Sequence, residues 1–188
     1  MPKFFVFLCE GDHDQNLMRL VVEKNSITGK NCSQEQILNE KIRGGESTII
    51  RDNYRKFSLK RTTKKFALIK NEKNKDICLE IFIELLKGGD SEYFLIAIFD
   101  QDTKTLRTVK DAIKKELKKE VKQISENCYE IRQKQFFFII PQSLEIQIND
   151  STGKKIDNKR GKKRQMKCLS QFIEVNPSWI ADMEQLFE

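Results

Sequence analysis

The chain has 188 residues, of which 38% are hydrophobic and 34% charged, and it carries a formal net charge of +7. This length suits one domain, and the apolar content is sufficient for a packed core, which excludes a wholly disordered chain. The longest apolar runs, residues 4–9 and 136–140, are far shorter than the roughly 20 residues of a membrane span. The N-terminal segment also lacks the extended apolar region of a secretory signal. We therefore expect a cytoplasmic protein with no membrane partner.

The chain begins with a continuous apolar segment at residues 3–9, which predicts a strand buried on both faces and hence a parallel sheet. This segment ends abruptly at Glu10-Gly11-Asp12. The apolar spacing that follows predicts a helix over residues 14–24.

Residues 25–65 have a weaker pattern. We expect a short helix near 33–41 and a turn at Gly44-Gly45.

The middle of the chain alternates apolar strands with helices. We predict a strand over 65–69, a helix over 77–86 that stops at Gly88-Gly89, and a buried strand over 93–99. The clearest amphipathic helix follows at 103–122, where leucine, isoleucine and valine recur on one stripe.

A further buried strand at 136–140 and helices near 168–174 and 178–187 complete the alternation, and Trp179 is expected to anchor the last helix. Such alternation predicts an α/β fold with a mostly parallel sheet flanked by helices. We place the main domain at residues 1–150. Residues 151–188, a basic loop and C-terminal helices, are expected to pack on the same domain.

Five cysteines are widely scattered, no CxxC pair occurs, and His13 is the single histidine. This pattern argues against a structural zinc site and suits a reducing compartment with cysteines in the core. Nucleophilic catalysis with a histidine base would have to rest on His13, which we interpret instead as an exposed turn residue outside the site.

Two segments concentrate the basic charge and leave the rest of the chain acidic. Residues 51–65 hold seven basic residues and one acidic residue, and residues 154–167 hold eight and one. Such segments favour a nucleic-acid partner, contacted through its phosphates, over two solvated loops. The candidate contact residues are Arg51, Arg55, Lys56, Lys60, Arg61, Lys64 and Lys65 in the first segment and Lys154, Lys155, Lys159, Arg160, Lys162, Lys163 and Arg164 in the second.

Acidic residues follow three of the predicted buried strands. Glu10 follows the first, Asp100 and Asp102 follow the strand at 93–99, and Glu145 lies just past the strand at 136–140. The carboxyl ends of parallel strands meet at one edge of a sheet, where ligands bind. Carboxylates at such short distances repel one another unless they share a cation. A site with oxygen ligands and no histidine or cysteine selects Mg²⁺ or Mn²⁺. With Asp14, these residues predict a metal site.

The two sequences FVFLCEGDHD and FLIAIFDQD resemble the motifs of the Toprim domain, which topoisomerases, bacterial primases and several nucleases share. The later PQSLE is similar to the Ser-x-Glu of nucleases of the OLD (overcoming lysogenization defect) class. The resemblance spans residues 3–150, although about a dozen positions carry it. It implies a Toprim-like, Rossmann-like sheet and metal ligands for up to two ions. Those ligands would be Glu10, Asp14, Asp100, Asp102, Ser143 and Glu145.

The chain departs from the family in two respects. Glu10 and Asp100 are further apart than in a minimal Toprim domain, so the resemblance implies that residues 25–65 are an insertion after the first strand–helix unit. No Walker A phosphate-binding loop is present, so the ATPase half of full-length OLD proteins is missing from this sequence. No topoisomerase-type tyrosine module is evident. A separate ATPase chain or another protein is therefore a further candidate partner, and the oligomeric state is open.

The resemblance and the residues together predict a nuclease that uses Mg²⁺ or Mn²⁺ to cleave nucleic-acid phosphodiesters, with DNA placed ahead of RNA. Glu10, Asp100 and Asp102 are the expected catalytic carboxylates, and Lys154, with Lys155 beside it, is the candidate lysine for stabilising the phosphate. Two alternatives stay open: a non-catalytic nucleic-acid-binding or regulatory Toprim module, and primase-like nucleotidyl transfer.

Overall fold

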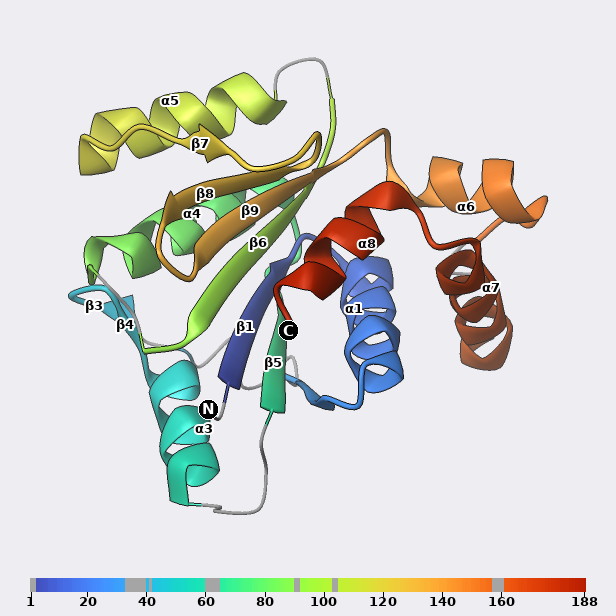
Figure 1. The fold of residues 1–188 in the computed structure, drawn as a ribbon, viewed down its shortest axis with the longest axis horizontal. Helices are drawn as coiled ribbons and strands as arrows, with labels where there is room; N and C mark the ends of the chain where they lie inside the picture. Colours follow the sequence, from blue (N-terminus) through green and yellow to red (C-terminus); the bar gives the residue numbers. More distant parts are fainter. Residues whose placement is uncertain are drawn as a thin grey trace.

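The computed structural model describes residues 3–32, 40, 42–59, 65–89, 92–102, 105–156 and 161–188. A seven-stranded sheet lies between helices on both faces (Figure 1). The strands of this sheet are β1 (Lys3–Cys9), β2 (Thr28–Asn31), β5 (Lys65–Asn71), β6 (Phe94–Asp100), β7 (Lys122–Gln123), β8 (Cys128–Arg132) and β9 (Gln135–Ile140). A separate hairpin is formed by β3 (Ile42–Arg43) and β4 (Glu46–Ser47). The helices are α1 (Asp12–Lys24), α3 (Thr48–Leu59), α4 (Lys75–Lys87), α5 (Thr105–Leu117), α6 (Leu144–Thr152), α7 (Lys162–Val175) and α8 (Ser178–Gln185).

The strand order in the large sheet is β2-β5-β1-β6-β9-β8-β7. The first five strands pair in parallel, whereas β8 is antiparallel to β9 and β7 is antiparallel to β8. The predicted α/β fold with a mostly parallel, helix-flanked sheet is therefore confirmed. The central strands β1, β6 and β9 are neighbours, which places their carboxyl ends at the same edge.

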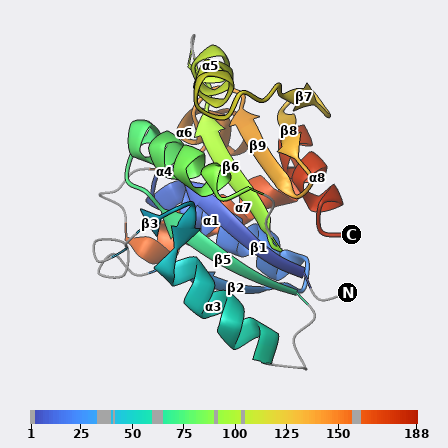
Figure 2. The same ribbon diagram turned by 90° about the vertical axis from the view of Figure 1, so that its left-hand side faces the viewer.

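The continuous apolar runs reflect burial on both faces of the sheet. Successive residues of a strand point to opposite sides, so Phe5 and Phe7 of β1 join one core, while Phe4, Val6 and Leu8 join the other. The first core lies under α1, α6, α7 and α8, and the second under α3, α4 and α5. Figure 2 looks onto the layer that contains α3, α4 and α5.

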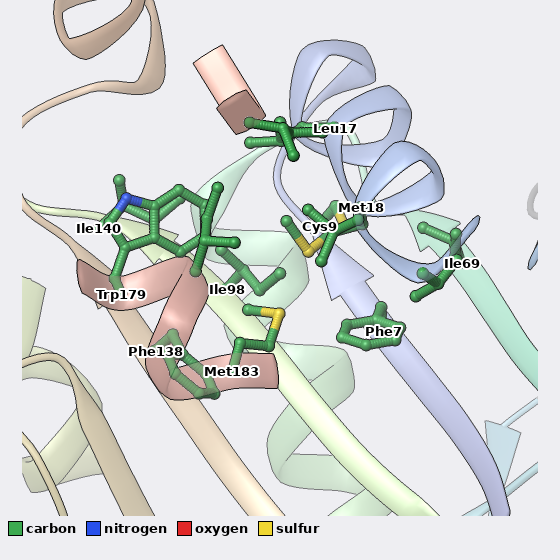
Figure 3. Packing of buried hydrophobic residues seen from close by; sticks show 14 of the residues in the cluster. Phe7, Cys9, Leu17, Met18, Ile69, Ile98, Phe138, Ile140, Trp179 and Met183 are labelled. Atoms are coloured by element: carbon green, nitrogen blue, oxygen red, sulfur yellow. The ribbon is translucent and has the colours of Figure 1, made fainter. Parts of the chain in front are cut away.

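The C-terminal helices pack on the same sheet as the rest of the chain. Trp179 and Met183 of α8 belong to the first core together with Phe138, and Met183 lies beside Phe138 (Figure 3). The Trp179 side chain is 1% exposed, and its Nε1–H donates to Gln147 Oε1 at 3.1 Å. The predicted anchoring by Trp179 is therefore confirmed.

Several predicted boundaries were wrong. The helix expected over 103–122 ends at Leu117, because Lys118 takes a positive φ of 55° and the chain then enters β7. The helix expected near 168–174 begins at Lys162, so part of the basic loop is helical. Helices α3 and α6 and strands β2 and β8 had no clear sequence signal and were not predicted.

The segment interpreted as an insertion contributes to the main sheet through β2, which pairs with β5. Its predicted turn at Gly44-Gly45 joins β3 to β4, whereas the short helix expected near 33–41 lies largely outside the described residues. Lys70 of β5 is fully buried and forms ion pairs with Glu40 and with Glu72, the latter at 3.0 Å. This cluster ties the segment before β3 to the sheet.

Candidate active site

The structure brings acidic side chains together at the carboxyl ends of the central strands. Glu10 follows β1, Asp100 is the last residue of β6, and Glu145 lies in the first turn of α6 after β9. Asp14 joins them because α1 begins two residues after Glu10. This is the edge of the sheet at which the sequence predicted a site.

Hydrogen bonds position two of these carboxylates. Glu10 Oε1 accepts a bond from the backbone N–H of Asp100 at 3.0 Å. Asp14 Oδ2 accepts from the backbone N–H of Gly11 at 3.1 Å, which fixes it at the start of α1. Among the described residues, Asp100 Oδ1 is buried and has no hydrogen-bond partner. A buried oxygen without a donor is costly, so a cation at this position would be stabilising.

The carboxylates raise one another's pKa. Burial, and then the charge of Asp100, raises the pKa of Glu10 to about 7. Burial and the charge of Glu145 raise the pKa of Asp100 to about 6. Asp14 is buried, and its pKa lies well above its usual range because of burial and then the charges of Asp100 and Glu10. Negative charge therefore accumulates here without full compensation, a situation that a bound proton or cation relieves.

Lys75 is a functional candidate that the sequence analysis missed. It is the first residue of α4, and its Nζ donates to Asp102 Oδ2 and to Thr105 Oγ1, each at 2.9 Å. Its positive charge lowers the pKa of both Glu10 and Asp100. The sequence signal that could have identified Lys75 is its position shortly after β5, whose carboxyl end lies at the same edge as the other strand ends.

Asp102 is placed differently from the other acidic residues. Its side chain is 62% exposed and is paired with Lys75. Its backbone N–H donates to Thr105 Oγ1 at 3.0 Å, and the Thr105 hydroxyl donates to the backbone carbonyl of Asp100 at 3.0 Å. Thr105 therefore links the backbones of Asp100 and Asp102.

Ser143 acts at the start of α6 as a helix cap. Its Oγ accepts from the backbone N–H of Ile146 at 3.4 Å, the usual N-cap arrangement. It also hydrogen-bonds to Glu145 and thereby helps to lower the pKa of that carboxyl. The described contacts of Ser143 are thus to its own helix and to Glu145.

The expectation that His13 is an exposed turn residue was wrong. Its side chain is only 9% exposed, because α1 begins at Asp12 and turns this residue towards α6. His13 Nδ1 lies 3.0 Å from Glu145 Oε1, and this hydrogen bond is the main cause of the lowered pKa of Glu145. His13 therefore holds Glu145 at the edge of the site.

The donors fit a hard divalent cation in their chemistry, because they are carboxylate oxygens and one of them is the orphaned Asp100 Oδ1. As the side chains stand, however, the described part of the chain contains no group of three or more His, Cys, Asp or Glu side chains placed to hold a metal ion. The fit thus rests on donor type and on accumulated charge, with Glu10, Asp14 and Asp100 as the residues that would hold the ion.

The Lys154 side chain forms its hydrogen bond away from the carboxylates. Its Nζ donates to Gln171 Oε1 of α7 at 2.5 Å, and its backbone N–H donates to Thr152 Oγ1 at 3.3 Å. These contacts tie Lys154 to α6 and α7, whereas Lys75 contacts the turn that carries Asp102. Of the two lysines, the geometry favours Lys75 at the carboxylates.

The described helical parts of the two basic segments lie on opposite faces of the sheet, because α3 packs on the second core and α7 on the first. Of the predicted contact residues, the exposed ones are Arg51, Arg55 and Lys56 on α3, Lys155 after α6, and Lys162, Lys163 and Arg164 on α7; Lys65 and Lys154 are half-buried. The predicted contact residues Lys60, Arg61, Lys64, Lys159 and Arg160 lie outside the described residues.

No protein-family model matches the chain, and no curated protein matches it. Two solved structures of de novo designed proteins, both determined by NMR, are weakly similar. A designed PLOOP2X3_50 fold protein is 12% identical, with 95% of this chain and 99% of that chain covered and a TM-score of 0.40. A designed protein with the P-loop NTPase fold is 14% identical, with 91% and 90% covered and a TM-score of 0.32. Likenesses this weak carry no argument about function.

In the part of the chain that the structure describes, no helix is long and apolar enough to cross a membrane.

Proposed function

We propose that this protein is a Toprim-type nuclease that uses Mg²⁺, or Mn²⁺, to cleave phosphodiester bonds of nucleic acid. The observation that carries the proposal is the pairing of Glu10 with Asp100, held by a 3.0 Å hydrogen bond at the ends of two adjacent parallel strands. Carboxylates gathered in this way repel a phosphate unless a cation lies between them. Their presence at a substrate-binding edge therefore favours metal-assisted phosphoryl chemistry over binding alone.

Glu10, Asp14 and Asp100 are the residues that would hold the ion, because burial and their mutual repulsion already raise the pKa of each. When bound, a divalent cation supplies Lewis-acid activation and neutralises charge on the phosphate. Glu145 completes the acidic edge, and the hydrogen bond from His13 keeps that carboxylate ionised and oriented. A second ion, with Glu145, Asp102 and Ser143 as its ligands, belongs to the same proposal.

Lys75 is the residue that we assign to the phosphate. Its side chain is 27% exposed, so its ammonium group borders solvent while it remains anchored to Thr105. A positive charge fixed beside the reacting phosphate stabilises the charge that develops in the transition state. The ion pair with Asp102 holds Lys75 in place before substrate arrives.

A cleavage assay tests this function. Single- and double-stranded DNA and RNA are incubated with Mg²⁺ or Mn²⁺, with an EDTA arm, and products are resolved by length. We expect metal-dependent cleavage that Glu10→Gln and Asp100→Asn each reduce at least roughly 100-fold. Glu174→Gln, an exposed carboxylate on α7, is the matched control and should leave the rate unchanged. Cleavage that persists in both site variants overturns the mechanism.

A non-catalytic nucleic-acid-binding module is the second candidate. It is favoured by the finding that no three His, Cys, Asp or Glu side chains within the described residues are placed to hold an ion. In that case the same assay would yield retarded but intact strands, and binding would be insensitive to EDTA. Newly made oligonucleotides in the presence of nucleoside triphosphates would instead indicate nucleotidyl transfer.

A further inference from the structure

A pocket lies at the opposite end of the sheet from the carboxylates, with a volume of about 240 Å³. It is an open pocket lined by the β3–β4 hairpin, by α3, by the C-terminal end of α4 and by the residues just before β6. Figure 2 shows these elements close together on one face of the molecule. Because it borders the amino end of β6, the pocket is separate from the site at the carboxyl ends.

Two aromatic rings form a wall of the pocket. The ring centroids of Tyr54 and Tyr93 are 6.3 Å apart, with 54° between the ring planes. Both rings pack edge-on against Phe4, at 5.4 Å and 6.2 Å, and Phe4 is only 2% exposed. The tyrosines are thus held in place from behind. The electron-rich face of a tyrosine ring attracts cations.

A second wall is formed where the hairpin meets the end of α4. A Cβ atom on Gly45 would lie 2.2 Å from the backbone nitrogen of Gly88, so the two backbones are in direct contact. The helix therefore presents its C-terminal end to the pocket, where Leu85, Gly88 and Gly89 are lining residues. The C-terminal end of a helix carries partial negative charge. At this end of α4 the carbonyl of Leu86 already accepts from the Arg132 guanidinium at 3.0 Å and that of Gly89 from Gln135 at 2.6 Å, so the cation-binding groups of the pocket are its side chains.

The charged side chains around the pocket are predominantly acidic. Among the described lining residues, Glu46 and Glu92 are acidic and Arg51 is the one cation. The guanidinium of Arg51 is 3.9 Å from Glu46 and is half exposed. Burial and the charges of Glu46 and Glu40 raise the pKa of Tyr93 to about 12, and burial and a hydrogen bond with Glu92 raise the pKa of Tyr54. Negative charge therefore lies close to both phenol groups.

We propose that this pocket binds an organic cation, an ammonium or guanidinium group carried either by a small molecule or by a basic side chain of another protein. The tyrosine rings would contact the cation, and Glu46 and Glu92 would accept its hydrogen bonds. Arg51 occupies part of the same negative field and so competes with the ligand. The proposal is independent of the nuclease function, because no residue of the carboxylate site takes part.

The test is an NMR titration of the whole chain, followed through backbone amides. The chain has eight glycines, and Gly45, Gly88 and Gly89 all line the pocket, so their amide signals report on it directly. The probes are agmatine and putrescine, with 1,4-butanediol as the uncharged analogue of putrescine. We expect saturable shifts at these glycines with the two cations and none with the diol. Equal shifts with the diol, or no shifts with either cation, overturn the proposal.

Variants then test the assigned contacts. Glu92→Gln should weaken agmatine binding roughly tenfold, because it removes a charge-assisted hydrogen bond. Arg51→Ala should tighten binding, since the competing cation is lost, whereas Glu174→Gln on α7 should have no effect. Tyr54→Phe, which keeps the ring, should retain binding, whereas Tyr54→Leu should lose it. Unchanged binding in both Glu92→Gln and Tyr54→Leu contradicts the assignment.

The source of the cation is distinguished by adding capped tripeptides with a central lysine or arginine. Tighter binding of a peptide than of agmatine identifies a side chain of a protein partner as the occupant. Tighter binding of agmatine identifies a small molecule. Both results support the recognition of an organic cation. If neither the peptides nor agmatine shift the glycine signals, the proposal is rejected.

Discussion

Glu10 and Asp100 are 90 positions apart in the chain, yet Glu10 Oε1 accepts a hydrogen bond from the backbone N–H of Asp100 at 3.0 Å. The contact exists because β1 and β6 are adjacent parallel strands that end at the same edge. It holds two acidic side chains in a partly buried space, and both have raised pKa values. The stability of the protein is therefore expected to depend on whether this edge is neutralised.

Without a divalent cation, the free energy of unfolding should fall as the pH rises. The pKa of Glu10 is raised from 4.5 to about 7 and that of Asp100 from 3.8 to about 6 in the folded state. Between the unfolded and folded values the folded state binds more protons, so this stabilisation is complete below the unfolded pKa values and is lost as the pH passes the folded values. Urea unfolding in EDTA should show a loss of roughly 1–3 kcal/mol between about pH 5 and pH 8, allowing for partial exposure of both groups.

The matched variants for this dependence are Glu10→Gln and Asp100→Asn, which keep the shape of each side chain but cannot ionise. Each should flatten part of the pH dependence and should be at least as stable as the parent at high pH. A slope that neither variant alters would show that the titrating groups lie elsewhere.

Mg²⁺ should raise the melting temperature, and more strongly at about pH 8 than at about pH 6. The ion requires ionised ligands, and at lower pH it competes with protons for Glu10 and Asp100. Scanning calorimetry with Mg²⁺, against NaCl of equal ionic strength, gives the measurement. The double variant Glu10→Gln/Asp100→Asn should lose the difference, and equal shifts from both salts would indicate general screening.

Lys75→Ala should reduce cleavage roughly 10- to 100-fold, because the fixed charge beside the carboxylates is lost. It should also move the pH profile upwards, because Lys75 lowers the pKa of both Glu10 and Asp100. Lys75→Arg should retain part of the activity and the position of the profile. Lys154→Ala is the comparison, since Lys154 is bound to Gln171 and should have the smaller effect. The reverse order of effects would return the role to Lys154.

The hairpin beside the pocket offers a matched pair of glycine substitutions. Gly45 has a φ of +82°, and its added Cβ would lie 2.2 Å from Gly88 N, whereas Gly44 has a φ of +57° and nothing within 4 Å of an added Cβ. Gly44→Ala should cost about 1 kcal/mol for the left-handed backbone alone. Gly45→Ala should cost roughly 2 kcal/mol more, because the hairpin must separate from α4. Urea unfolding measures both, and equal costs would contradict the backbone contact.

The two basic helices should contribute unequally to nucleic-acid binding. Helix α7 packs against α1 and α6, the helices that carry Asp14 and Glu145, whereas α3 lies on the other face of the sheet. Lys162→Ala/Lys163→Ala should therefore lower the slope of log affinity against log salt by about 1 to 2, and Arg55→Ala/Lys56→Ala should lower it less. The measurement is the affinity of each variant for a short duplex over a series of salt concentrations. An equal loss from both pairs would show that nucleic acid contacts both faces.

Much of the fold could be predicted because its signals are local. Each central strand is buried on both faces, so β1, β6 and β9 appear as unbroken apolar runs that depend on no distant residue. Edge strands lack this property: β2 reads TGKN and pairs on one side only, and the sequence analysis did not find it. The basic segment of α3 was missed because its lysines and arginines obscured the few apolar positions that it buries, Ile50 and Phe57.

The sequence alone determined the type of sheet and the presence of acidic residues after three of its strands, because strand burial and strand ends are encoded by neighbouring residues. Only the tertiary structure decided which side chains meet. The pairing of His13 with Glu145 and the placement of Lys75 beside Asp102 both follow from the order of strands in the sheet. Contacts of this kind join distant segments through space, and their energies depend on burial and on charges that spacing along the chain does not specify.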